Sequence, residues 1–106
     1  MEDTIGRQLV RAGTSVGANY RSACRARSVA EFLSRIGIAE EEADESAYWL
    51  ELIIEGRLMS EKRVRPLLQE ADELTAIFAA SIKTARRNPK SKIQNPKSET
   101  KERTHA

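Results

Sequence analysis

The stretch from Gln8 to Leu50, QLVRAGTSVGANYRSACRARSVAEFLSRIGIAEEEADESAYWL, decides the fold of this chain. Apolar residues recur in it every three or four positions, which is the period of an amphipathic helix. The pattern is interrupted once, at Ala26–Ser28, so it predicts two helices joined by a short turn. The second helix carries apolar residues on two faces, and such a helix needs a partner in addition to its own domain.

Sequence signals mark both ends of the second helix. Ser28 followed by Glu31 is a capping box, in which the hydroxyl accepts a hydrogen bond from a backbone N–H and the carboxylate reaches back. Gly56 is typical of the C′ residue that ends a helix. The apolar face between these signals is expected to form the core and consists of Val29, Phe32, Leu33, Ile36, Ala39, Ala43, Ala47, Leu50 and Ile54.

Four large side chains of the second helix point away from that core face: Ile38, Tyr48, Trp49 and Leu52. Scattered apolar residues on a protein surface are common and need no special explanation. A Tyr–Trp pair on an otherwise acidic helix is, however, typical of contact anchors in interfaces. We therefore interpret these four residues as an oligomer interface.

The first helix is expected to span about Thr4 to Arg25. Its core face consists of Ile5, Leu9, Ala12, Val16, Tyr20 and Ala23. Three glycines follow one flank, and because an interior Gly costs about 1 kcal/mol relative to Ala, they indicate that another backbone approaches there. These are Gly6, Gly13 and Gly17. The other flank is polar and is either solvated or hydrogen-bonded to a neighbouring helix; it consists of Gln8, Arg11, Ser15, Asn19 and Ser22.

A third helix is predicted to start near Ser60 or Pro66 and to run to about Ala85, with regular helix from Pro66. An irregular turn is expected at Ser60–Arg65, because a proline deeper inside a helix clashes with the preceding turn and removes a hydrogen bond. Ile77 lies off the core face and would add to a second contact. That core face consists of Val64, Leu67, Leu68, Ala71, Leu74, Phe78, Ile82 and Ala85. No segment alternates like a strand, so the sequence predicts an all-α, up-and-down antiparallel helical bundle.

Three blocks of residues resemble the bacterial four-helix bundle proteins that are often encoded in intervening sequences of 23S ribosomal RNA genes. The similarity covers about Ile5 to Asn88. The first block, which matches the family signature, is Arg11, Ser15, Asn19 and Tyr20. The second block is Phe32, Glu42, Glu45, Tyr48, Trp49 and Leu50, and the third is Ser81–Ala85.

The resemblance implies a bundle that assembles into a ring-shaped homo-oligomer, a pentamer in known members, without established enzymatic activity. One branch of the family serves as an accessory protein to a retroelement reverse transcriptase, and RNA or DNA binding has been proposed for others. Members normally have a further amphipathic helix before the segment equivalent to Gln8. We expect this first helix to be absent here, so that one groove of the bundle stays uncovered unless a partner fills it. Many members also have Glu at the position of Ser22.

Composition points to a small cytoplasmic protein that is not an enzyme. The chain has 106 residues, no long apolar run for a membrane, and no signal-peptide pattern after Glu2 and Asp3. Cys24 is the sole cysteine, which suits a reducing compartment. No catalytic motif, cofactor-binding motif or metal-ligand spacing is present, and the acidic run from 40 to 45 lacks the histidines of a bundle metal site.

Charge is unevenly distributed along the chain. Residues 1–30 hold five arginines and two acids, whereas residues 31–60 hold two arginines and eight acids. The first helix would therefore present a basic face, which either pairs with acidic neighbours or attracts nucleic-acid phosphates when repeated around a ring. This face consists of Arg7, Arg11, Arg21 and Arg25.

Two segments are predicted: a helical bundle domain over residues 1–87 and a disordered basic tail over residues 88–106. The tail is rich in Lys, Pro and Ser, repeats the run Asn-Pro-Lys-Ser, and has too few apolar residues to form a core. The sequence leaves two functions open. One is an oligomeric interaction or scaffold module, and the other is an accessory protein that binds RNA or DNA through the basic face.

Overall fold

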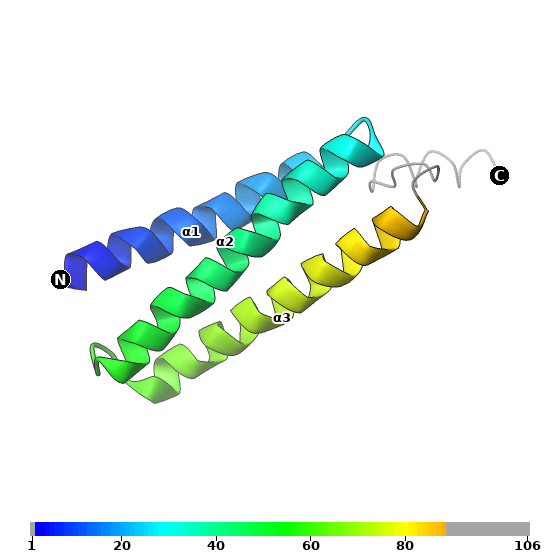
Figure 1. Ribbon diagram of the computed structural model, residues 1–106. Helices are drawn as coiled ribbons and strands as arrows, with labels where there is room; N and C mark the ends of the chain where they lie inside the picture. Colours follow the sequence, from blue (N-terminus) through cyan, green and yellow to red (C-terminus); the bar gives the residue numbers. More distant parts are fainter. Residues whose placement is uncertain (1, 89–106) are drawn as a thin grey trace, which may run out of the picture.

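The computed structural model describes residues 2–88, which form three α-helices (Figure 1). They are α1 (Glu2–Cys24), α2 (Val29–Glu55) and α3 (Glu61–Arg87). The prediction of an all-α bundle is confirmed, and no strand occurs among the described residues. Most of the predicted basic tail, residues 89–106, lies outside them.

The middle helix, α2, packs against both of the others, whereas α1 and α3 approach each other only weakly. The turns at 25–28 and 56–60 are short, so each helix runs antiparallel to the one before it. The C-terminal ends of α1 and α3 therefore lie at the same end of the bundle as the start of α2 (Figure 1).

Two apolar clusters make the core, one toward each end of the bundle. Alanine is the most frequent buried residue, which lets the helices approach closely, and the largest fully buried side chains are Ile36 and Val64. The cluster at the α1–α2 turn contains Val16, Ala23, Ile36, Ala39, Ala43 and Phe78. The cluster at the α2–α3 turn contains Ala47, Leu50, Ile53, Val64, Leu68 and Ala71.

The predicted capping box at the start of α2 is present with one difference. The Ser28 hydroxyl accepts a hydrogen bond from the backbone N–H of Glu31 at 3.0 Å. The Glu31 carboxylate reaches back to the backbone N–H of Arg27, at 3.2 Å, rather than to that of Ser28. Both bonds satisfy groups that a helix start leaves without partners.

The end of α2 differs from the prediction by one residue. Gly56 was expected at the left-handed C′ position, but it has φ −79° and is the C-cap. Arg57 takes the left-handed conformation instead, with φ 55°. Its N–H donates to the carbonyl of Ile54, and that of Leu58 donates to Ile53, which is the Schellman pattern.

The prediction of an irregular turn at Ser60–Arg65 is wrong, because α3 begins at Glu61. Pro66 lies inside the helix, where its missing N–H leaves only the carbonyl of Lys62 without a helical donor. Packing explains the outcome. Val64 is 2% exposed, one turn before buried Leu68, and both enter the same cluster only if the helix is regular through Pro66.

The core faces are otherwise close to those predicted, with three corrections. On α2 the buried residue is Ile53, with Ile54 only half-buried, and Ser46 is also buried. Two helices flank α2, so its buried arc is wider than a single apolar face. Tyr20 and Leu67, both assigned to the core, are each 51% exposed because α1 and α3 stay apart.

Candidate functional surfaces

The polar flank of α1 is joined to α2 by one arginine. The Arg11 guanidinium donates to Glu42 Oε2 at 2.8 Å and to the Glu45 carboxylate, while its Nε donates to Gln8 at 3.1 Å. These hydrogen bonds, first with Glu45 and then with Glu42, raise the pKa of Arg11. The hydrogen bond from Arg11 in turn lowers the pKa of Glu45. The charge of Arg11 is thus already compensated by two carboxylates.

The other signature residues lie nearby on α1. Asn19 is half-buried and donates to the backbone carbonyl and to the hydroxyl of Ser15, at 3.0 and 3.1 Å. Tyr20 points toward α3, with its ring centroid 5.8 Å from that of Phe78, and the neighbouring Cys24 thiol raises the pKa of its hydroxyl. Of the signature residues, only Arg11 joins two helices through a hydrogen bond or salt bridge within residues 2–88.

The outer face of α2 consists of Ile38, Tyr48, Trp49 and Leu52, the residues interpreted as an oligomer interface. Ile38 is 37% and Tyr48 53% exposed, while Trp49 and Leu52 are half-buried. The Tyr48 and Trp49 rings meet edge to face, with centroids 5.0 Å apart. The indole nitrogen of Trp49 is buried without a hydrogen-bond partner among the described residues, although Glu45 lies one turn earlier.

An apolar groove runs between α1 and α3 over α2, with a volume of about 290 Å³. A Cβ added at Gly6, Gly13 or Gly17 would meet nothing within 4 Å, so no backbone approaches the glycine flank of α1 in the protomer. Leu67 on the opposite wall is half-exposed, and Ile77, further along α3, is 56% exposed. The groove is lined by Leu9, Gly13, Val16, Ala43, Ser46, Leu50, Leu67, Glu70, Ala71 and Leu74.

The predicted basic face of α1 is divided by the structure. Arg7, Arg21 and Arg25 are exposed and make no salt bridge within residues 2–88, whereas Arg11 is paired with α2. Arg7 lies toward the start of α1, at the opposite end of the bundle from Arg21 and Arg25. Their role in nucleic-acid binding stays a prediction.

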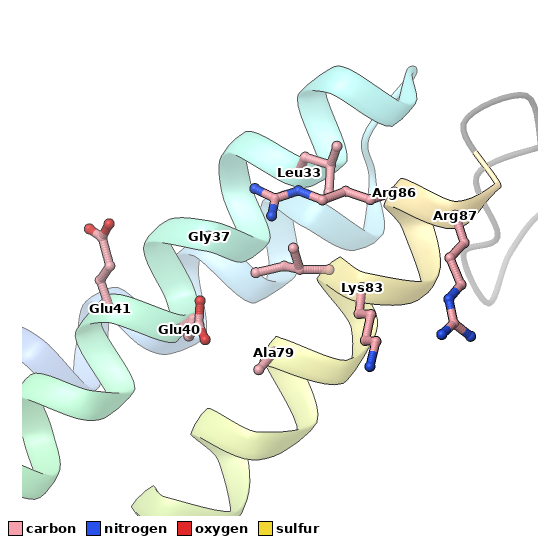
Figure 2. A pocket seen from close by; sticks show the side chains of 9 residues that line it. Leu33, Gly37, Glu40, Glu41, Ala79, Lys83, Arg86 and Arg87 are labelled. Carbon is pink, nitrogen blue, oxygen red and sulfur yellow. The ribbon is translucent and has the colours of Figure 1, made fainter.

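Sequence reasoning missed a hollow between α2 and α3 (Figure 2). Its volume is about 620 Å³, and its cations come from the last turns of α3: Lys83, Arg86 and Arg87. Arg86 extends across the hollow toward Leu33 of α2, while Glu41 points away from α3 (Figure 2). These cations are distant in sequence from the first-helix arginines, so only helix packing relates the two sets.

No group of three or more His, Cys, Asp or Glu side chains within residues 2–88 is placed to hold a metal ion. His105 lies outside this part of the chain. None of the three helices is long and apolar enough to cross a membrane.

These features define an all-α helical-bundle protein with exposed apolar and charged surfaces. The family comparison is specific: the 23S rRNA-intervening sequence protein family matches residues 2–80, and the chain belongs to this family. It is also similar to the crystal structure of a protein of unknown function from the S23 ribosomal protein family of Bacteroides thetaiotaomicron. That similarity has a TM-score of 0.71 and 35% identity, and it covers 74% of this chain and 73% of the other. No curated protein matches the sequence.

Proposed function

We propose that this protein is a non-enzymatic, self-assembling interaction module whose uncovered apolar surfaces are closed by other copies of the chain. The observation that carries the proposal is the α1–α3 groove, an apolar channel that the described residues leave open. Exposed apolar surface of this kind marks interaction sites in soluble proteins.

The outer face of α2 provides a complementary surface. Ile38 and Trp49 lie roughly 100° around α2 from the residues of that helix that line the groove, so one protomer presents both surfaces in different directions. The outer face of one copy would then enter the groove of the next. A contact between two different surfaces is head-to-tail and produces a ring when its rotation closes. The ring-shaped homo-oligomer implied by the family resemblance is of this type.

Charge favours this pairing over an identical-surface dimer. The outer face of α2 is flanked by exposed acidic side chains, among them Glu41 and Glu55. Beside the glycine flank, α1 presents arginines: Arg21 lies one turn after Gly17 on the same side of the helix. Within a protomer, Arg11 already pairs with Glu42 and Glu45, which shows that these two helices are complementary in charge.

A mixing experiment tests the proposal. Gly13→Leu would fill the groove without a clash inside the protomer, since a Cβ there meets nothing within 4 Å. Trp49→Ala would weaken the outer face. Gly37→Ala, at an equally open glycine on another surface, is the matched control.

Light scattering should show an oligomer for the wild type and the control, and monomers for each single variant. An equimolar mixture of the two variants should form a dimer, because one intact groove and one intact outer face remain. A monomeric wild type would reject self-assembly. An oligomeric wild type whose two variants do not combine would reject the head-to-tail pairing alone.

A second candidate is an accessory role in which RNA or DNA, and through it a retroelement reverse transcriptase, is the partner. The observation in its favour is that Arg7, Arg21 and Arg25 are exposed without salt bridges among the described residues. In this version the basic face of α1 is the binding surface, although Arg11 is compensated by α2. The Arg7→Glu, Arg21→Glu and Arg25→Glu changes should each weaken binding if the whole face takes part.

A further inference from the structure

We infer that one end of the bundle, formed by all three helices, is a binding site for the phosphate backbone of a nucleic acid. The basic end is defined here by the cations of residues 21–35 and 81–88. They are Arg21, Arg25, Arg27, Arg35, Lys83, Arg86 and Arg87. The inference does not depend on self-assembly. The basic end shares Arg21 and Arg25 with the basic face of α1, but it excludes Arg7 and Arg11 and adds cations from α2 and α3.

Helix topology creates this site. The last turn of α1, the turn at 25–28, the first turns of α2 and the last turns of α3 meet at the same end (Figure 1). The core cluster beneath them joins all three helices, because it combines Ala23, Ile36 and Phe78. Cations about 60 residues apart in the chain, such as Arg25 and Arg86, are therefore held on one rigid support.

The charge of the described chain is divided between this end and the remainder. The basic end has seven cations and a single acid, Glu31. The rest of residues 2–88 holds six cations and thirteen acids. A chain that is nearly neutral overall thus has a strongly positive end and a negative remainder, which orients a polyanion toward one end.

The seven cations are available to a ligand. All are exposed, and none takes part in a salt bridge within the described residues. The carboxylate of Glu31 is occupied by the backbone N–H of Arg27. Arg21, Arg86 and Arg87 lie in the last turns of α1 and α3. Their presence there is explained by the favourable interaction of a cation with the negative end of a helix dipole. This interaction does not account for Arg27, which precedes the positive end of α2.

The hollow between α2 and α3 gives the site depth. Leu33 and Gly37 of α2 and Ala79 and Ile82 of α3 supply apolar lining. Lys83, Arg86 and Arg87 of α3 supply three cations, and Glu40 and Glu41 line the hollow from α2, with Glu41 pointing away from α3 (Figure 2). An unpaired base has an apolar face and a neighbouring phosphate, and this combination matches the hollow. Single-stranded nucleic acid is commonly bound by a basic groove that follows its backbone.

An anionic membrane fits the basic end less well. Peripheral membrane binding combines basic residues with apolar side chains that enter the lipid. No large apolar side chain is exposed within residues 21–35 or 81–88. Six of the seven cations are arginine, whose planar guanidinium forms paired hydrogen bonds with phosphate oxygens.

The test measures binding of the full chain to a short, fluorescently labelled single-stranded RNA by anisotropy, at salt concentrations between about 50 and 200 mM. The variant carries Lys83→Gln, Arg86→Gln and Arg87→Gln. The matched control carries Arg7→Gln, Lys62→Gln and Arg63→Gln, three exposed cations at the opposite end, so both proteins have the same net charge.

The wild type should bind with affinity that falls as salt rises, with a slope of about −0.7 per phosphate contact in the logarithmic plot. The basic-end variant should lose about ten-fold or more in affinity, and the control less than about two-fold. Single-stranded DNA of the same sequence and vesicles of phosphatidylglycerol are the comparison ligands.

Absence of RNA and DNA binding, equal losses in the two variants, or an unchanged affinity of the basic-end variant would each overturn the inference. Binding to vesicles without binding to nucleic acid would overturn it as well. The oligomer mass, measured on the same samples, reports separately on self-assembly.

Discussion

Replacing Arg57 by glycine should stabilise the protein, because Arg57 is a non-glycine residue in the left-handed conformation. A side chain in this region costs roughly 1–2 kcal/mol. Glycine removes that cost but loses more backbone entropy on folding, about 0.5–1 kcal/mol. The Arg57 N–H bond to Ile54 is retained in the variant. The net expectation is a gain of about 0.5–1 kcal/mol in the free energy of unfolding.

Urea unfolding followed by circular dichroism measures this gain at fixed protein concentration, since assembly would make stability concentration-dependent. The midpoint should rise without a change in slope. Gly56→Ala is the paired control. Its new Cβ would lie 3.0 Å from the Leu52 carbonyl oxygen, so this variant should be less stable than the wild type. A loss of stability in Arg57→Gly, or a gain in Gly56→Ala, would refute the assignment of the left-handed residue.

Two further predictions concern the helix contacts. Arg11 lowers the pKa of Glu45 in the folded protein. The pair therefore adds its full stability above the usual glutamate pKa of about 4.3. This stability is lost as the pH falls through the lower pKa that Glu45 has in the folded protein. Glu45→Gln should therefore reduce the stability lost on acidification from about pH 5 to pH 3, and equal acid sensitivity of both proteins would contradict this. Pro66→Ala should restore the missing hydrogen bond to the Lys62 carbonyl and stabilise α3 by about 1 kcal/mol. The gain is measured as a higher melting temperature. A lower melting temperature would show that the proline does not destabilise the helix.

Local signals in the sequence predicted where the helices form, but they placed the first and last residues of the helices less accurately. The Ser28–Glu31 capping box was recognised because its groups are three residues apart, within reach of each other in any helix start. The proline rule predicts regular helix only from Pro66, whereas burial of Val64 extends α3 back to Glu61. Gly56 was placed one position too late in the Schellman motif, because the sequence does not show which residue of Gly56–Arg57 becomes left-handed.

The sequence predicted a candidate surface more accurately when the surface belongs to one helix than when two helices form it. The outer face of α2 belongs to one helix, so its periodicity placed Ile38 and Trp49 on the same side. An uncovered groove in the bundle was expected only through the family resemblance, and a groove lies between α1 and α3. The glycines of α1 predicted the close approach of another backbone, and within the protomer no backbone approaches them.

By itself, the amino-acid order determined the helical class, the approximate spans and the acidic and basic helices, because these depend on neighbours within one or two turns. Only the tertiary structure decided that Arg11 is compensated by Glu42 and Glu45, and that Arg25 and Arg86 share one end of the bundle. Such charges lie more than 30 residues apart in the chain, and their distance is set by how alanine-rich faces pack the helices together.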